Sequence, residues 1–233
     1  MKTYSRRDLT VVSGFDNNGS CLVIACDSCG SVGEKETDTL KLPAKYTSKF
    51  AARVALTEVI CSGASPITIT NGASNEMTPT GEELIKGIKE ELANAQITGI
   101  ALTGSTEENF PTNMTAVAVT VIGIAKEDEL NFKQATNGDV VIQIGIPQAG
   151  KEVDLESVGF YKEIRQFLSL PGVREIVPVG SKGITYEANT LATLNNMDMH
   201  FEKQTSPTQI YINLPAQQHA YWCCVRRNRR GMC

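Results

Sequence analysis

The chain has 233 residues, of which 22 are Lys or Arg and 26 are Asp or Glu, so its formal net charge at pH 7 is −4. At roughly 100–200 residues per domain, this length predicts one large domain or two small ones. Hydrophobic residues make up 41% of the chain, but no apolar run approaches the roughly 20 residues of a membrane-crossing helix. These values exclude an integral membrane protein, and the negative charge argues against general affinity for nucleic acid.

The beginning of the chain and its cysteines indicate a cytoplasmic protein. The apolar stretch that follows Arg6 and Arg7 is too short for a secretory signal, and no small-residue cleavage site comes after it. In a reducing cytosol, most of the seven cysteines are expected to be free thiols.

Short β-rich runs alternate with amphipathic helical patterns over the first 150 residues. Runs over 9–13 and 21–26 flank the turn sequence Asp16-Asn17-Asn18-Gly19, which predicts a hairpin. The patterns further predict a loop over 30–43, helices over 48–60 and 80–99, and strands over 67–69, 100–103, 115–125 and 140–146. Hairpins with covering helices are typical of an α+β layer architecture with a mixed or antiparallel sheet.

A change of composition near Gly150 predicts a domain boundary at 148–154. We therefore expect a first domain over 1–150, a second α+β domain over 151–216 that is short enough to be a truncated one, and an atypical tail over 217–233. The second domain is expected to hold a helix over 156–170, a strand over 176–179 and a helix over 186–195.

The tail differs from the rest of the chain, because it holds the only Trp, three of the seven Cys and four closely spaced arginines. Three interpretations are open: a disordered end, a basic arm for nucleic acid, or a terminus created by a shifted reading frame. A disordered end would have solvated arginines and exposed cysteines and would contribute nothing to the stability of the protein.

The first candidate site is a carboxylate at the end of an apolar strand. Asp27 is followed by the Gly- and Ser-rich segment 28–34 and by Lys35. A rigidly held carboxylate suits Mg²⁺, which takes one or two carboxylates together with phosphate oxygens, whereas the alternative is that Asp27 only begins a turn. Cys26 and Cys29 have no companion Cys or His pair at a spacing that suits zinc, so we expect ordinary thiols there.

The second candidate site is Glu58, which interrupts an apolar helical pattern. A buried acid is costly unless it is paired or binds a metal. The alternative is an ion pair with Arg53, although the i, i+5 spacing of the two residues is poor for that contact.

The third candidate site is the loop that follows the strand at 100–103. The sequence Thr103-Gly104-Ser105-Thr106 offers backbone N–H groups and hydroxyls to phosphate oxygens, and Glu107 or Glu108 could hold a bridging metal. The alternative is a hydrophilic turn.

Taken in this order, the three sites resemble the aminoimidazole ribonucleotide synthetase (PurM-like) superfamily, over about residues 8–150 and weakly as far as Gly183. Asp27 matches the strand-end metal aspartate of the superfamily, Thr57-Glu58 matches its Ser-Asp pair, and residues 103–106 match its Gly-Gly-Asp/Glu-Thr motif. The resemblance implies metal and catalytic roles for Asp27 and Glu58.

The resemblance also implies ATP and Mg²⁺ as cofactors, with nucleotide phosphates held by Lys35 and by Thr103, Gly104, Ser105 and Thr106. Ser105 departs from the family pattern, since an acid is expected there, and this moves a third metal ligand to Glu107 or Glu108. The segments 7–10, 75–81 and 103–109 look most similar to the synthetase-related proteins that include α-ribazole kinase of cobamide salvage.

Two classes of function remain open. The first is an ATP-dependent kinase that phosphorylates α-ribazole to its 5′-phosphate, with thiamine monophosphate as the second acceptor considered. The second is a non-catalytic nucleotide-binding protein, which Ser105 and the short second domain favour.

The β runs at 21–26, 67–70 and 116–125 are apolar in both of their alternating sets of side chains. A lone domain would leave apolar surface of these runs exposed, so they predict a homodimer. The resemblance implies the same assembly, since the superfamily pairs its N-terminal sheets across a twofold axis. The partners expected are therefore a small-molecule substrate and a second copy, with neither nucleic acid nor membrane.

Overall fold

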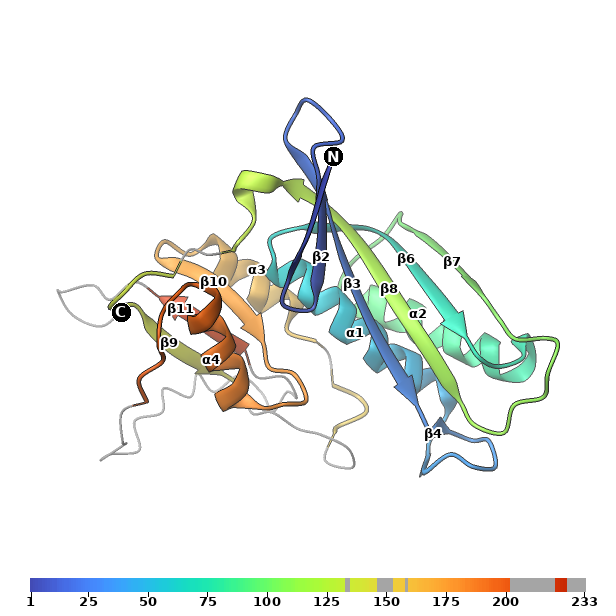
Figure 1. Cartoon of the computed structure of the whole chain (residues 1–233). Coiled ribbons are helices and arrows are strands. Elements are labelled where there is room, and N and C mark those ends of the chain that lie inside the picture. The colour runs from blue at the N-terminus through green and yellow to red at the C-terminus, as the bar shows by residue number, and fades with distance from the viewer. Residues whose placement is uncertain (133–134, 146–152, 158, 202–220, 226–233) are drawn as a thin grey trace. The chain divides into compact units, whose positions relative to one another are not determined.

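The computed structural model describes residues 1–132, 135–145, 153–157, 159–201 and 221–225 (Figure 1). The chain forms two compact units, Met1–Leu130 and Asn131–Cys233. The predicted boundary near 148–154 falls mostly on residues outside the described ranges. None of the described helices has the length and apolar character needed to cross a membrane.

A six-stranded mixed sheet forms the centre of the first unit. Its order is β1-β2-β3-β8-β6-β7, and all neighbours are antiparallel except the parallel pair β6 and β7. The strands are β1 (Lys2–Arg6), β2 (Leu9–Ser13), β3 (Ser20–Gly30), β6 (Ser65–Ala73), β7 (Ala101–Ser105) and β8 (Ala116–Lys126), and β4 (Val32–Gly33) pairs with β5 (Leu40–Lys41) in parallel. The predicted α+β fold class is confirmed.

The predicted hairpin is also confirmed, and a further strand extends it. β2 pairs with β3 from Leu9 opposite Ala25 to Ser13 opposite Cys21. β1 joins β2 through a two-residue turn, Arg7-Asp8. No prediction was made for β1, because its sequence lacks a regular apolar alternation and it lies at the edge of the sheet.

Two long helices, α1 (Ala44–Cys61) and α2 (Glu82–Asn94), pack together, and α1 lies against the sheet (Figure 1). Small and branched apolar side chains of α1, such as Ala52, Leu56 and Val59, are fully buried. The helix approaches β8 so closely that a Cβ at Gly123 would lie 2.4 Å from Val59 Cγ1. Two short helical turns, η1 (Met77–Gly81) and η2 (Glu127–Glu129), complete the first unit.

A buried ion pair joins α1 to α2. Arg53 donates to both carboxylate oxygens of Glu91, at 2.7 and 2.9 Å, and both side chains are almost fully buried. The proposed alternative pairing of Arg53 with Glu58 is therefore wrong. Glu91 lies on the facing helix, and no local spacing rule relates it to Arg53.

The second unit holds a three-stranded antiparallel sheet in the order β10-β11-β9. Its elements are β9 (Val140–Ile144), α3 (Tyr161–Ser169), β10 (Val173–Pro178), α4 (Ile184–Leu194) and β11 (Tyr221–Val225). Val177, Ala188 and Leu191 are buried together in its core.

The tail contains the central strand of this sheet. Residues 221–225 pair with β10 on one side and with β9 on the other. The prediction that the tail is disordered throughout is wrong for these five residues, because their β-branched, aromatic and cysteine residues suit a strand. Residues 217–220 and the arginines at 226–230 lie outside the described ranges.

On the two central strands of the sheet, β3 and β8, the face turned away from the helices is largely apolar and only partly covered. β3 and β8 alternate between side chains buried toward the helices and side chains that are half-buried or exposed. The second set contains no charged residue between Leu22 and Cys26 or between Ala116 and Ile124, and its members include Leu22, Ile24, Ala118, Thr120, Ile122 and Ile124. We call this set the open sheet face.

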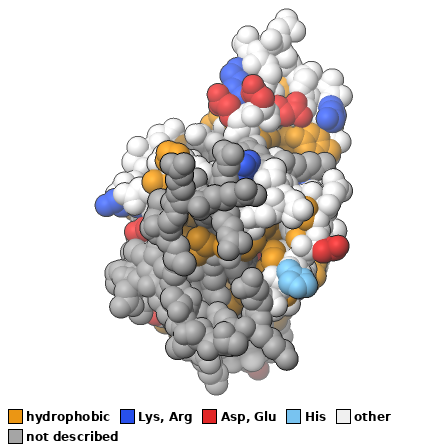
Figure 2. All heavy atoms as spheres, turned by 90° about the vertical axis from the view of Figure 1, so that its left-hand side faces the viewer, with side chains coloured by type: hydrophobic (Ala, Val, Ile, Leu, Met, Phe, Trp, Pro, Cys, Tyr) orange, Lys and Arg blue, Asp and Glu red, His pale blue; other side chains and the backbone are white. Residues whose placement is uncertain are grey.

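Charges of both signs are intermixed on the surface. On the face shown in Figure 2, Asp and Glu side chains lie close to Lys and Arg side chains. Among the described residues of that face there is no broad basic patch of the kind that nucleic acids require.

Candidate functional site

Three loops of the first unit meet at one end of its sheet, toward the lower right of Figure 1. They are residues 31–42, 74–81 and 105–115, which we call the loop cluster. Backbone hydrogen bonds of 2.9 Å tie them together: Ser31 N–H donates to Thr115 O, Thr37 N–H to Asn113 O, and Glu107 N–H to Asn75 O. The three segments therefore form one connected platform.

Asn75 and Asp38 hold this platform from within. The buried amide of Asn75 donates to Thr112 Oγ1 and Met114 O, and its oxygen accepts from Ala116 N–H. The buried carboxylate of Asp38 accepts from the N–H and the hydroxyl of Thr115, both at 2.8 Å, and from Lys35 N–H. Sequence reasoning missed both residues, because their partners are far away in the chain.

The candidate phosphate-binding residues 103–106 lie at the edge of the sheet. Thr103, Gly104 and Ser105 are exposed on β7, and Thr106 follows in the loop. A Cβ at Gly104 would lie 2.3 Å from Asn71 Oδ1, so only glycine fits beside β6 there. The backbone of this edge strand is accessible to a ligand on its outer side.

The carboxylates of Glu107 and Glu108 are engaged with the protein. Glu107 accepts from the backbone N–H groups of Asn109 and Phe110, at 2.7 and 3.2 Å. Glu108 accepts from Met77 N–H at 2.7 Å and from the Thr106 hydroxyl at 2.9 Å. These contacts shape the loop and join it to η1.

Lys35 lies at the centre of the loop cluster. Its Nζ donates to Glu76 Oε2 at 2.7 Å and to Thr112 O at 3.0 Å, so it links all three segments. Glu76 also accepts from the Thr80 hydroxyl. Burial alone would raise the pKa of Glu76, but the hydrogen bonds from Lys35 and Thr80 outweigh it and lower this pKa to about 2.

Asp27 lies on β3 opposite Val119, on the side of the sheet that faces the helices. Its side chain is partly buried and forms no ion pair with the described residues. Burial is the main cause that raises the pKa of Asp27, and the nearby charge of Asp8 adds to it. Burial and the carboxylates of Asp27 and Asp38 likewise raise the pKa of the Cys29 thiol.

Glu58 is held by an arginine. Arg7 Nη2 donates to both carboxylate oxygens of Glu58, at 2.9 and 3.0 Å, and the two side chains are only 8% and 11% exposed. The loop cluster instead meets the beginning of α1, where the Thr47 hydroxyl donates to Val32 O. At 1.5 Å per residue, Glu58 lies about 16 Å further along the helix axis than Thr47.

The described residues do not gather three acidic, His or Cys side chains into a group that could hold a metal ion. Asp27, Glu58 and the pair Glu107 and Glu108 are thus placed on separate elements. Asp27 forms no ion pair with the described residues, and the one hydrogen-bond partner that affects its pKa is the backbone N–H of Ser28, so its carboxylate fits Mg²⁺ that also takes phosphate oxygens and water.

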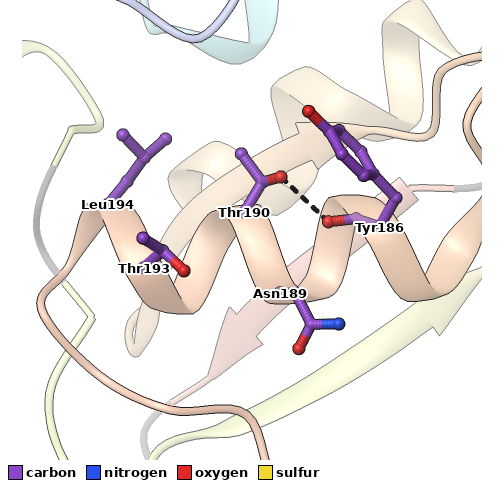
Figure 3. A pocket seen from close by; sticks show the side chains of 5 residues that line it. All are labelled: Tyr186, Asn189, Thr190, Thr193 and Leu194. Atoms are coloured by element: carbon purple, nitrogen blue, oxygen red, sulfur yellow. Dashed lines mark hydrogen bonds between the residues drawn. The ribbon is translucent and has the colours of Figure 1, made fainter.

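A small pocket of about 330 Å³ lies in the second unit. Figure 3 shows that all five of its lining residues lie on α4: Tyr186, Asn189, Thr190, Thr193 and Leu194. The Thr190 hydroxyl donates to the Tyr186 carbonyl within the helix, and no charged side chain lines the pocket. It contains none of the candidate metal- or phosphate-binding residues.

Solved structures with the same fold bind nucleotides. PurL of T. maritima complexed with ATP aligns with a TM-score of 0.61 and 13% identity, over 94% of this chain and 37% of that chain. ThiL complexed with AMPPCP and TMP aligns with a TM-score of 0.63 and 12% identity, over 94% and 79%. Thiamine monophosphate kinase from Aquifex aeolicus aligns at 0.61 with 12% identity, over 91% and 82%.

These alignments define the class of the fold, a PurM-like α+β domain. Residues 8–125, just over half of the chain, match the family described as AIR synthase related protein, N-terminal domain. The chain belongs to this family, as the sequence motifs predicted. No curated protein matches the chain closely enough to serve as a relative.

Proposed function

We propose that the protein is an ATP- and Mg²⁺-dependent kinase of a small alcohol. The observation that carries the proposal is the loop cluster, in which the Lys35 ammonium contacts the other two segments and which continues into the edge strand β7 with the exposed Thr103, Gly104 and Ser105. Phosphoryl transfer requires mainly positioning and neutralisation of charge, and these groups supply donors for phosphate oxygens.

Asp27 is the residue we assign to Mg²⁺. A bound cation would favour its ionised form and so offset the burial that raises its pKa. The ion would supply charge neutralisation at the phosphates. Glu58, Glu107 and Glu108 remain candidate ligands only if they exchange their present partners for the metal.

For the acceptor, we propose α-ribazole, phosphorylated to its 5′-phosphate, on the resemblance of segments 7–10, 75–81 and 103–109. A thiamine-monophosphate acceptor carries a phosphate of its own and needs further basic groups. In the loop cluster, Lys35 is already paired with Glu76, and Lys41 donates to the carbonyls of Lys35 and Glu36. These contacts favour an uncharged acceptor.

The second candidate function is nucleotide binding without catalysis. It is favoured by Ser105 in place of an acid and by the ion pair that occupies Glu58. Production of ADP that depends on an added alcohol distinguishes the two functions.

We also propose that the protein is a cytoplasmic homodimer paired through the open sheet face. The supporting observation is that this face is uncharged and only partly covered, and apolar surface of this kind marks interaction sites.

The proposal is tested by incubating the full-length protein with Mg-ATP and both acceptors in competition, followed by mass spectrometry of the products. We expect α-ribazole 5′-phosphate. Phosphorylation of thiamine monophosphate alone would overturn the acceptor assignment, and no product from either, with nucleotide binding retained, would favour the non-catalytic function.

A further inference from the structure

The contact between Lys35 and Glu76 is unusual for a group assigned to phosphate. A lysine that binds an anion would be expected to point into solvent when the anion is absent. Lys35 Nζ instead contacts the Glu76 carboxylate at 2.7 Å and the carbonyl of Thr112. The Lys35 side chain is 18% exposed and that of Glu76 is 32% exposed, so the pair lies at the surface of the platform, where a ligand can reach it.

Glu76 is itself fixed from the other side. The Thr80 hydroxyl donates to Oε1 while Lys35 donates to Oε2, so both carboxylate oxygens are occupied. The next residue, Met77, is held by Glu108 through its backbone N–H. The carboxylate position is therefore set by η1 and by the loop at 105–115 together.

We propose that Glu76 is a positioning residue for phosphoryl transfer that acts through Lys35. It fixes the position of the Lys35 ammonium within the loop cluster and balances the charge of that ammonium when no phosphate is bound. This inference rests on the proposed function. Glu76 does not act as a general base, because a carboxylate paired in this way has little affinity for a proton.

The proposal predicts a separation of binding from catalysis. Removing the charge of Glu76 leaves Lys35 unbalanced, so ground-state attraction for Mg-ATP is kept or increased, while the ammonium loses its fixed position. In Glu76→Gln we expect kcat to fall by about tenfold while KM for Mg-ATP does not rise. In Lys35→Gln we expect KM for Mg-ATP to rise. Adding Glu76→Gln to Lys35→Gln should lower kcat/KM no further, because the two residues act as one unit.

A second measurement does not depend on turnover. Acylation requires a lysine Nζ that is released from its hydrogen bonds, and Lys35 Nζ is held by Glu76 and by Thr112 O. Labelling the full-length protein with an N-hydroxysuccinimide ester and quantifying the Lys35 peptide should show several-fold faster modification in Glu76→Gln than in the wild type. Mg-ATP should protect Lys35 in both.

The matched control is the ion pair between Lys45 and Glu90, which also joins two segments of the first unit and has similar exposure, 22% and 34%. Glu90→Gln should leave kcat, KM and the labelling of Lys35 unchanged. Should Glu76→Gln fail to fold, Thr80→Val removes one donor to the same carboxylate and is expected to shift kcat and labelling in the same direction by a smaller factor.

Unchanged labelling of Lys35 in Glu76→Gln, or additive losses in the double variant, would overturn the role of Glu76. If the wild type transfers phosphate to no acceptor, the proposed function fails. In that case two measurements still decide whether Glu76 positions Lys35 for an anion. They are the ratio of Lys35 labelling in Glu76→Gln to that in the wild type, and the protection of Lys35 by Mg-ATP.

Discussion

Asp27 and Glu58 have the same acidic group in contrasting surroundings. Asp27 is partly buried and forms no ion pair within the part of the chain that the structure describes, and its pKa is raised, whereas Glu58 is buried against Arg7. Arg7 adopts a positive φ of 52°, which disfavours most residues, and its contact with Glu58 helps to offset that cost. The first acid is therefore available to a ligand and the second stabilises the fold.

We expect Asp27→Asn to abolish Mg-ATP binding without lowering the melting temperature at pH 7. A carboxyl whose pKa is raised on folding stabilises the folded state less as pH rises through its folded pKa, and removing its charge relieves this cost. The variant should thus be at least as stable as the wild type at pH 7, and the difference should vanish below about pH 4. Calorimetric titration and thermal unfolding at several pH values measure both effects, and a variant that loses its fold would indicate a structural role.

Glu58→Gln is expected to act in the opposite way. It leaves the buried Arg7 guanidinium without its counter-charge, which typically costs about 3–5 kcal/mol of folding free energy. Urea unfolding of the variant, with the exposed Glu129→Gln as control, measures this loss. A variant of unchanged stability that no longer binds Mg-ATP would instead support Glu58 as a metal ligand.

Among the elements, those with a clear apolar period were predicted well. The hairpin of β2 and β3 and the strand β8 occur where the alternations placed them, and α2 begins near the predicted acidic first turn but ends at Asn94 instead of continuing to Gly99. α1 begins four residues earlier than predicted, since Pro43 and not Ser48 precedes its first turn.

The contacts within the candidate site were less accessible to sequence reasoning. The motifs predicted which segments carry polar groups, but not that Asn75 and Asp38 fasten them together or that Lys35 contacts Glu76. The contacts by which these three residues join separate loops span 37–77 positions, and no local pattern encodes such pairings.

The tail strand β11 leads to a prediction that reverses the one made from composition. Deleting residues 217–233 removes the strand to which both β9 and β10 are paired, so the second unit should lose stability. For a unit of about this size, each kcal/mol lost lowers the melting temperature by roughly 4–8 °C. Differential scanning calorimetry of the truncated and full-length proteins makes the comparison, and identical melting would show that residues 221–225 are dispensable.

At the scale of the whole molecule, the open sheet face is expected to decide the oligomeric state. Ile24 and Ile122 lie directly opposite each other on β3 and β8, so Ile122→Asp places a charge in the middle of the uncharged face. Sedimentation should show a dimer for the wild type and a folded monomer of about 25.2 kDa for the variant. A wild-type protein that sediments as a monomer at micromolar concentration would rule out this assembly.

The chain covers 37% of the length of PurL and 79% of that of ThiL, so it shares their fold over different fractions of each protein. Both compact units pair strands that are far apart in the chain: β8 begins 86 positions after the end of β3, and β11 begins 43 positions after the end of β10. In the first unit all paired strands come from the first 126 residues, whereas the second unit needs residues 221–225 to complete its sheet.

This arrangement has a consequence for synthesis of the protein on the ribosome. The first unit has all its strands once residue 126 has left the exit tunnel, and folding of its sheet need not wait for the rest of the chain. β9 and β10 do not pair with each other, so both present open edges until residues 221–225 emerge to fill the space between them. Chaperone binding or premature association is therefore expected while β9 and β10 have emerged and β11 has not.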